Sequence, residues 1–498
     1  MEFEGLCRGG CVVITTHEID NNLGRTFMEC GFFTSVFNLQ ATNLPGCSMK
    51  ELDCLFFPKS VALVGATPDP AKLGGIVLRN LIRLKGTVYP VNPKYGEILG
   101  IRSFPSVADL PETVDLSVIL RPAADVPAIL EAHRGKARFV LVVSAGFAEV
   151  GASELQAEII RIGREGGLRL VGPNCLGLYN PRHRLDTMFL PHACLKRPKR
   201  GNVAVVSQSG AVMICLLEAI RMANTGISKV MNYGNAVDLD APEVYEYLAE
   251  DDDTAVVVSY LESVGDGRRF LKAARFLSDR KPLLILKAGK GAGGGAAAFS
   301  HTGRLAGNYE VFHSLMNHYG LHEVACFDEL LDGAKAVSYQ RPVPGKRVCI
   351  ITNGGGAGVL AVDECAHRGL VLPDLPDEVR RDLREAFPSF YTVANPIDLT
   401  GQVRVDDYRE ALFAVRDVCD GFLVIAMTGV AGVTLRLADH LREFREKAGK
   451  PVVVHIAQGG VAPRLIRLTE RAGIPVYPSP ERAVRGLASL LGKGGSHG

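Results

Sequence analysis

The sequence predicts an α/β protein composed of three doubly wound domains, each with a parallel sheet. Three observations support this fold class. The chain has 498 residues, enough for about three domains. Short apolar runs of strand length alternate with segments that are apolar at helical spacing, which is the pattern of βαβ units. This pattern begins again at Asn202 and once more at Arg347.

Residues 1–48 differ from the rest of the chain. They contain four of the 12 cysteines and lack clear periodicity, whereas a regular pattern begins at Met49. We interpret 1–48 as an N-terminal extension that is either disordered or the product of a mis-called translation start. Its apolar run 11–14 is too short for a signal peptide. A mass spectrum of native protein beginning at Met1 would contradict the mis-called start.

Five strands are predicted in the first domain. They are 60–64, 87–91, 116–120, 139–143 and 168–171. Each is followed by a turn that contains Gly, Pro or polar residues. Ligands of doubly wound sheets bind beyond the carboxyl ends of the strands, so the residues of these turns are candidate contacts. They are Gly65, Asn92, Lys94, Pro122, Ser144 and Asn174.

The turn after the first strand is long. Eight residues separate Gly65 from Gly74, so the turn does not match GxGxxG, and an NAD-dependent oxidoreductase is disfavoured. Backbone N–H groups at a helix N-terminus can still bind a phosphate, with Lys72 and Lys94 as candidate cations. The alternative is that both lysines are solvated surface charges.

The second domain opens with the strand 202–206, and the turn Ser207-Gln-Ser-Gly-Ala211 leads from it into a helix. Hydroxyl groups and N–H groups that converge at a helix start bind anions. Ser207, Ser209 and Gly210 are therefore candidate phosphate ligands. Alternatively, Ser209 is only the N-cap of the helix, which needs no ligand.

A loop of Gly and Ala in the same domain contains His301. The strand 282–287 leads into this loop, and the strand 254–261 ends at Glu262. Carboxyl ends of parallel strands share one sheet edge, so we expect the loop, Glu262 and the serine turn to be close together. A carboxylate beside a histidine fixes the tautomer and supports the positive charge. The pattern indicates a phosphohistidine site, with His301 and Glu262 as catalytic residues. The alternatives are a Gly/Ala linker with an exposed histidine and a surface acid.

The third domain echoes the second. It opens with the strand 347–352 and the turn Asn353-Gly-Gly-Gly-Ala357, followed by an apolar helix. Asn395–Asp398 repeats the pattern of Gly234–Asp238 in the second domain. We interpret the two domains as copies of one fold. The third copy lacks a histidine loop, so packing and contact with a partner are its predicted roles.

Composition narrows the class of protein. Hydrophobic residues make up 47% and charged residues 22%, as in a globular protein. The formal net charge of +2 indicates neither a nucleic-acid nor a membrane-surface partner. The longest apolar stretch, 422–435, is interrupted by Thr428, Gly429 and Gly432 and falls short of the ~18 residues of a spanning helix. Scattered cysteines without a CxxC pair are typical of reduced thiols in the cytoplasm, and they predict no metal site in this chain.

Several motifs together resemble the NDP-forming acyl-CoA synthetases, the superfamily that includes succinyl-CoA synthetase. The closest resemblance is to the α subunit of ADP-forming acetate–CoA ligases, and it covers about 49–491. The combination is specific, although no single motif is. The motifs are Val64-Gly-Ala66 with Leu73-Gly-Gly75, Tyr89–Lys94, Val143–Phe147, Gly172–Gly177, Val206–Ala211, Gly234-Asn235, and Ser300–Gly303 with Leu305–Gly307.

This resemblance implies a Rossmann-like CoA-binding domain followed by two flavodoxin-like domains. The implied boundaries are 49–180 for the CoA-binding domain, 181–200 for a linker, 201–341 for a ligase domain with the phosphohistidine loop, 345–492 for the second flavodoxin-like domain, and 493–498 for a tail. The implied CoA contacts are Gly65, Ala66, Lys72, Gly74, Val91, Asn92, Lys94, Pro122, Ser144, Gly146 and Asn174.

The resemblance also implies a reaction. Acyl-CoA and phosphate would give acyl phosphate and CoA, and the phosphoryl group would pass to His301 and then to ADP. Two half-sites need a carrier that moves between them, and a Gly/Ala tether would let His301 do so. Phosphoryl transfer itself mainly needs positioning and charge neutralisation. We find no ATP-grasp domain in the chain, so ATP or ADP with Mg²⁺ would bind to a partner β subunit. An α2β2-type hetero-oligomer that acts on a small carboxylic acid in the cytoplasm is expected.

One residue departs from the family pattern, because Arg304 occupies a position where a small residue is expected. The alternative function is a CoA-binding regulatory protein that lacks ligase activity. Incubation with labelled phosphate, acyl-CoA and the β subunit separates the two, since a protein without label on His301 would be regulatory.

Overall fold

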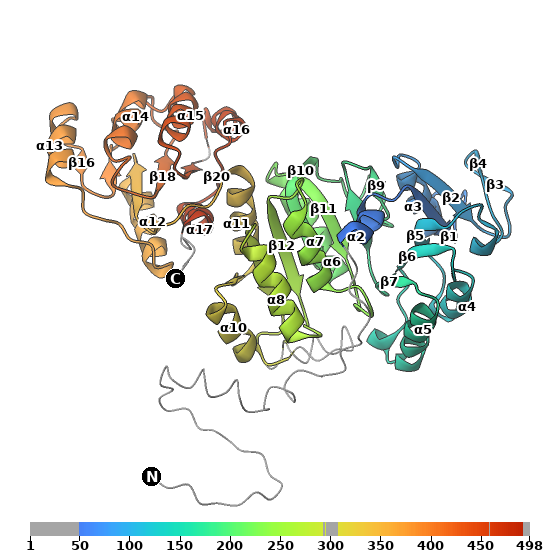
Figure 1. Ribbon diagram of the computed structural model, residues 1–498. Coiled ribbons are helices and arrows are strands. Elements are labelled where there is room, and N and C mark those ends of the chain that lie inside the picture. Colours follow the sequence, from blue (N-terminus) through green and yellow to red (C-terminus); the bar gives the residue numbers. More distant parts are fainter. Residues whose placement is uncertain (1–48, 292–293, 295–306, 458, 492–498) are drawn as a thin grey trace, which may run out of the picture.

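The computed structural model describes residues 49–491 apart from 292–293, 295–306 and 458. Three α/β domains lie in a row, each with a central sheet flanked by helices (Figure 1). The three-domain α/β fold predicted from the sequence is confirmed. The predicted extension 1–48 and the predicted tail 493–498 lie outside the described residues.

The first domain contains a five-stranded parallel sheet in the order β2-β1-β5-β6-β7. All of β1 is buried, because helices cover both faces of the sheet, and such strands are continuous apolar runs. The strand order reverses between β1 and β5, which opens a crevice beyond their carboxyl ends. The elements are α2 (Met49–Phe56), β1 (Ser60–Val64), α3 (Leu73–Leu81), β2 (Thr87–Val91), a hairpin of β3 (Glu97–Ile98) and β4 (Ile101–Arg102), β5 (Val114–Ile119), α4 (Val126–Glu131), β6 (Ala137–Val142), α5 (Ser153–Glu165) and β7 (Arg169–Val171).

The second domain contains a seven-stranded sheet in the order β14-β13-β12-β10-β11-β8-β9. Five strands are parallel, and β8 and β9 join one edge as an antiparallel pair. The predicted linker 181–200 therefore includes a strand of this sheet, and its Met188 and Leu195 are buried. The elements are β8 (Gly177–Asn180), β9 (Leu185–Asp186), β10 (Arg200–Ser207), α6 (Gly210–Met222), β11 (Ile227–Asn232), α7 (Ala241–Glu250), β12 (Val256–Leu261), α8 (Gly267–Ser278), β13 (Leu283–Lys287), α10 (Tyr309–His318), β14 (His322–Glu323) and α11 (Phe327–Tyr339).

The third domain contains a six-stranded sheet in the order β16-β17-β15-β18-β19-β20, in which only β16 is antiparallel. In each of the three sheets the parallel strands follow the same order: second, first, third, fourth, fifth. The second and third domains are thus copies of one fold, as their sequences predict. The elements are β15 (Val348–Thr352), α12 (Gly355–His367), α13 (Asp377–Ala386), β16 (Thr392–Val393), β17 (Ile397–Asp398), α14 (Val405–Ala414), β18 (Gly421–Ala426), α15 (Arg436–Ala448), β19 (Val452–Ile456), α16 (Ala462–Arg471), β20 (Val476–Tyr477) and α17 (Pro480–Leu490).

The domains share their apolar cores. One core of buried side chains includes residues of the first and second sheets, such as Leu63 of β1 and Met231 of β11. Another extends from the second domain into the third, where α11 packs along α17. Arg169 reinforces the first contact, with Nε 3.0 Å from the Asp238 carboxylate and Nη2 2.8 Å from that of Glu243. The first two domains are therefore held in a fixed relation, and the crevice between them has two defined walls.

Candidate active site between the first two domains

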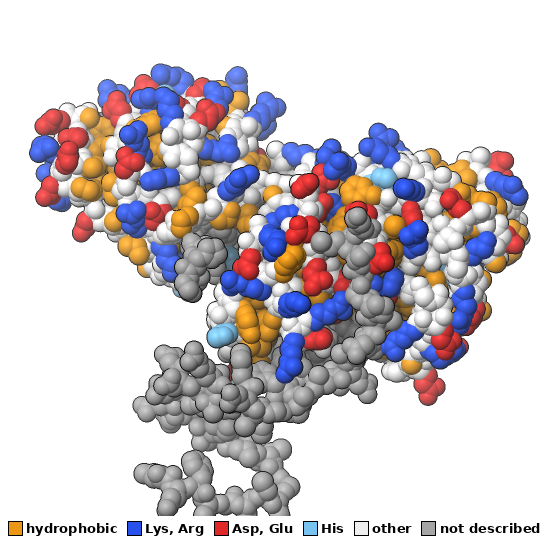
Figure 2. All heavy atoms as spheres, in the orientation of Figure 1, with side chains coloured by type: hydrophobic (Ala, Val, Ile, Leu, Met, Phe, Trp, Pro, Cys, Tyr) orange, Lys and Arg blue, Asp and Glu red, His pale blue; other side chains and the backbone are white. Residues whose placement is uncertain are grey.

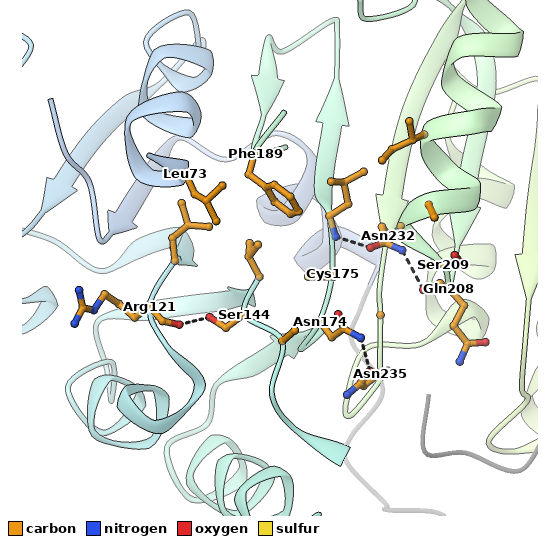
Figure 3. Close-up of a pocket in the computed structure, with 18 of the residues that line it drawn as sticks. Leu73, Arg121, Ser144, Asn174, Cys175, Phe189, Gln208, Ser209, Asn232 and Asn235 are labelled. Atoms are coloured by element: carbon orange, nitrogen blue, oxygen red, sulfur yellow. Dashed lines mark hydrogen bonds between the residues drawn. The ribbon is translucent and has the colours of Figure 1, made fainter. Parts of the chain in front are cut away.

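A cavity of about 710 Å³ lies between the first and second domains (Figure 3). Pro122, Ser144 and Asn174 line it from the carboxyl ends of the first sheet. Ser209 and Gly210 line it from the start of α6. The cavity therefore brings predicted CoA contacts and predicted phosphate contacts to one place. Its volume is that of a small-molecule site.

The serine turn is built by hydrogen bonds within itself. Ser209 has the extended conformation of an N-cap, and its Oγ accepts a hydrogen bond from the N–H of Val212 at 3.4 Å. Ser207 is fully buried, and its Oγ donates to the carbonyl of Ser209 at 2.7 Å. Ser209 thus caps α6, which the sequence left as an alternative. Ser209 and Gly210 also line the cavity, and the phosphate role of Ser207, Ser209 and Gly210 stays a prediction.

Asn232 connects this turn to the first domain. Its Nδ2 donates to the carbonyl of Ser207 at 2.8 Å. Figure 3 shows its two other bonds, in which Nδ2 donates to the carbonyl of Gln208 at 3.1 Å and Oδ1 accepts from the N–H of Leu176 at 2.5 Å. The side chain is buried, so these bonds form away from water and fix the start of α6 against the segment that follows β7. Asn232 ends β11 and was not among the residues predicted for the site.

Glu262 is 5% exposed and immediately follows β12, close to the serine turn in the fold. The Gln208 side chain joins the two, because its Oε1 accepts from the N–H groups of Glu262 at 2.8 Å and Ser263 at 2.9 Å. Burial and the nearby Glu262 carboxylate raise the pKa of the Tyr260 hydroxyl. The predicted proximity of the serine turn and Glu262 is thus present in the structure, and Gln208 provides it.

Two glycines of the first domain allow close packing. A Cβ on Gly74 would lie 2.0 Å from the carbonyl oxygen of Gly65, so the start of α3 rests directly on the turn after β1. Gly65 has a φ of +91°, which favours glycine. Asn92 joins the ends of β1 and β2, because its Nδ2 donates to the carbonyl of Ala66 at 2.7 Å. These residues form the framework of the predicted CoA site and do not line the cavity.

Asn174 and Asn235 form a polar bridge across the cavity floor (Figure 3). Asn174 Nδ2 donates to Asn235 Oδ1 at 3.3 Å, and Asn235 Nδ2 donates to Glu149 Oε2 at 2.6 Å. Burial would raise the pKa of Glu149, but hydrogen bonds from the N–H of Gly146 and from Asn235 lower it. The ionised carboxylate thus anchors Asn235 of the second domain to the first. Asn235 appeared in the sequence only as part of a family motif.

The predicted cations lie at the surface. Lys72 is 71% exposed at its side chain, with Nζ 3.9 Å from the Asp69 carboxylate, and Lys94 is also exposed. Arg121, which the sequence analysis missed, lines the cavity and pairs with Asp125 at 2.7 Å. The predicted contacts that do not line the cavity are Gly65, Ala66, Lys72, Gly74, Val91, Asn92, Lys94, Gly146, Ser207 and Glu262.

The cavity also has an apolar wall that was not predicted from the sequence. Leu73, Leu120, Leu176, Phe189 and Ile214 come from five separate segments and meet in the cavity. Phe189 belongs to the stretch predicted as a linker. Apolar residues that gather from distant segments leave no local pattern, so nothing in the sequence could have indicated this wall.

His301 and Arg304 lie outside the described residues, as does the rest of the predicted Ser300–Gly303 motif. Among the described residues, no group of three or more His, Cys, Asp or Glu side chains could hold a metal ion. Within the same residues, no helix combines the length and the apolar character that a membrane span requires. Basic and acidic side chains are interspersed over the face shown in Figure 2.

Models of three protein families match the three domains. A CoA binding domain matches 59–181, a succinyl-CoA ligase like flavodoxin domain matches 200–337, and a ligase-CoA domain matches 348–478. The fold and the cavity therefore define a protein that joins a CoA-binding domain to two ligase-type domains.

Similarity to individual proteins identifies the family more narrowly. The chain is 38% identical to acetate–CoA ligase [ADP-forming] I of Archaeoglobus fulgidus over 89% of this chain, but it spans only 63% of that relative. It is 35% identical to acetate–CoA ligase [ADP-forming] II subunit alpha of Pyrococcus furiosus, covering 88% of this chain and 97% of the relative. A structure of "Ca. Korarchaeum cryptofilum dinucleotide forming Acetyl-coenzyme A synthetase 1 in complex with phosphate and ADP" superimposes with a TM-score of 0.82 at 35% identity, covering 88% and 96% of the two chains. The chain belongs to the family of ADP-forming acetate–CoA ligases within the succinyl-CoA ligase superfamily, which confirms the resemblance.

Proposed function

We propose that this chain is the α part of an ADP-forming acyl-CoA synthetase of the acetate–CoA ligase type. The reaction interconverts acyl-CoA, ADP and phosphate with a carboxylic acid, CoA and ATP. One observation carries the proposal: a single cavity is lined by the strand ends of the CoA-binding domain and by the start of α6. A thioester and an attacking phosphate must meet in one place, and such a cavity holds them in reach of each other.

The residues around the cavity suit CoA. The helix α3 begins beside the cavity without a side-chain cap, so its first N–H groups are available to a phosphate group of CoA, with Lys72 exposed next to them. Pro122, Ser144 and Asn174 would contact the chain that leads inward, and the apolar wall would receive the acyl group. The thioester would then lie near Ser209 and Gly210.

The chemistry follows from this placement. A phosphate oxygen held by Ser209 and Gly210 attacks the thioester carbonyl, the C–S bond breaks, and CoA leaves. His301 takes the phosphoryl group from the acyl phosphate, which releases the carboxylic acid. Glu262 fixes the imidazole tautomer and supports its positive charge. The phosphoryl group then passes from His301 to ADP.

The nucleotide step belongs to a partner in this proposal. ATP or ADP with Mg²⁺ binds to an ATP-grasp β subunit in an α2β2-type complex in the cytoplasm. Coverage of 97% of a relative named subunit alpha supports a separate partner chain.

The test starts from a tagged chain purified from its native host with whatever protein it retains. The complex is given acyl-CoA, labelled phosphate and ADP, and label on His301 and formation of ATP are measured. We expect both in the wild type and neither in His301→Ala, because no other group carries the phosphoryl between the half-sites.

ATP formation by the His301→Ala complex would refute the phosphohistidine. A wild-type complex with an ATP-grasp partner that forms neither label nor ATP would favour the CoA-binding regulatory protein instead.

A further inference from the structure

Lys287 is a buried lysine of the second domain that lies beside Glu262, the acid that follows the neighbouring strand β12. It ends β13 and is 2% exposed. Its Nζ donates to the carbonyl of Glu262 at 2.7 Å and to that of Ala288 at 2.5 Å. The ammonium group therefore holds the backbone of Glu262 from the side of the neighbouring strand.

Glu262 is held from the other side as well. The side chain of Gln208 accepts a hydrogen bond from the N–H of Glu262, and its Nε2 donates to Ser263 Oγ at 2.9 Å. The N–H and the carbonyl of one residue are thus each bound by a buried side chain. Such a clamp fixes the position from which the Glu262 carboxylate leaves the backbone.

The third domain provides an internal comparison. Leu261 pairs with Lys287 in the second domain, and Ala426 pairs with Ile456 in the third. The residue after Ala426 is Met427, so Met427 and Ile456 occupy the places of Glu262 and Lys287.

The hydrogen bond to the backbone N–H is present in both copies. Asn353 follows β15 as Gln208 follows β10, and its Oδ1 accepts from the N–H of Met427 at 2.7 Å. The carboxylate and the ammonium are therefore present together in one copy and absent together from the other. A structural need of the fold would place a lysine in both copies, whereas a need created by Glu262 places it only in the second.

The charges around Lys287 explain how a buried ammonium group is tolerated at this position. Burial lowers its pKa to about 8, although Glu262 and Glu323 act to raise it, and Lys290 lowers it further. The ring of Phe312 lies 5.8 Å from Nζ. A buried ammonium is costly unless it is offset by an opposite charge, and Glu262 and Glu323 are the carboxylates that supply one.

We propose that Lys287 is a positioning residue for phosphoryl transfer. It fixes the Glu262 turn, and its charge offsets the Glu262 carboxylate and the phosphate that the site receives. This inference rests on the proposed function and adds to it the residue that distinguishes the phosphoryl-accepting copy of the fold from the other.

The experiment measures the initial rate of label incorporation into His301 from pH 6.5 to 9.5 in the complex with its partner. The variants are Lys287→Met and Lys287→Arg. The matched control is Lys281→Met, because Lys281 Nζ also binds two backbone carbonyls, those of Leu248 and Asp251, at the other end of β13. Thermal unfolding of every variant is recorded alongside.

We expect Lys287→Met to lower the rate by about 10- to 100-fold, the effect of a small misplacement of a reacting group. The wild-type ammonium loses its charge as the pH rises through about 8, whereas arginine stays charged. The ratio of the Lys287→Arg rate to the wild-type rate should therefore rise above pH 8. Lys281→Met should keep the wild-type pH profile.

Provided that the wild type is labelled, the inference would be overturned by an unchanged rate and pH profile in Lys287→Met, or by a rate ratio for Lys287→Arg that is constant with pH. A loss in Lys287→Met that Lys281→Met reproduces at equal loss of thermal stability would also overturn it. A wild type that takes no label refutes the proposed function itself, so the two failures are distinct.

Discussion

At the scale of single residues, the polar side chains of the site serve the fold as well as any ligand. Ser209 caps α6, Asn232 binds three backbone groups, and Gln208 binds the N–H groups of Glu262 and Ser263. Buried polar groups that have all their partners are rigid, which holds the cavity wall in place before a reactant arrives. The candidate site is therefore preorganised by the same bonds that stabilise it.

A change at Glu262 tests the role of its charge. Glu262→Gln keeps the size of the side chain but replaces the carboxylate by a neutral amide, which supports an imidazolium less well. We expect the rate of His301 phosphorylation to fall at least about tenfold. Glu250→Gln is the control, because Glu250 is a surface acid paired with Arg280 at 3.1 Å, and it should be phosphorylated at the wild-type rate. An unchanged rate in Glu262→Gln would reject the proposed role.

At the scale of elements, the start of α3 packs against the turn after β1 so closely that no side chain fits between them. The N-terminus of α3 approaches the turn after β1 so closely that Gly74 has no room for a Cβ. This approach places the start of α3 at the crevice where the strand order reverses, and its first residue, Leu73, lines the cavity. The glycine motif around Gly65 and Gly74 is thus explained by packing, which in turn positions the helix start.

Gly74→Ala should damage the CoA site through this contact. The added methyl group would push α3 away from the turn, at a cost of about 1–3 kcal/mol in the free energy of unfolding. We expect weaker CoA binding by calorimetry together with a lower unfolding temperature. Gly96→Ala is the control, since a Cβ there meets nothing within 4 Å, and it should change stability by no more than about 0.5 kcal/mol. Wild-type CoA affinity in Gly74→Ala would show that the position of α3 does not matter for binding.

At the scale of the whole molecule, the cavity exists because two domains are locked together. The shared apolar core and the ion pairs of Arg169 with Asp238 and Glu243 hold the two walls in place. Asp238 belongs to the segment that repeats in the third domain, so one copy of that segment has become an interdomain contact.

Arg169→Ala should loosen the two domains. The side chain of Arg169 is 17% exposed and those of its partners 6%, and removal of one member of a buried pair costs about 3–5 kcal/mol. We expect a lower urea midpoint and weaker CoA binding. Arg138→Ala removes a pair that is 61% exposed on the arginine side, and it should cost about 0–1 kcal/mol. Equal effects of the two substitutions would mean that the buried cluster does not hold the domains.

Much of this protein could be predicted without coordinates, because the signals are local. The strand 60–64 is apolar from Val61 onwards, and the serine turn marks the boundary between a strand and a helix. Residues at strand ends could therefore be predicted as ligand contacts, and five of them do line the cavity: Pro122, Ser144, Asn174, Ser209 and Gly210. The cavity's apolar wall, the clamp on Glu262 and the strand within 181–200 depend on distant segments, and no local pattern carries them.

By itself, the sequence determined the three α/β domains and the polar residues at the strand ends, since both follow from the pattern of neighbouring residues. Only the tertiary structure decided which strand ends share a cavity and which side chains connect the domains. The hydrogen bond from Asn235 to Glu149 joins residues 86 positions apart, and the one from the N–H of Glu262 to the side chain of Gln208 joins residues 54 apart. Such contacts form only when packed cores bring separate segments together, so their partners are chosen by the whole fold.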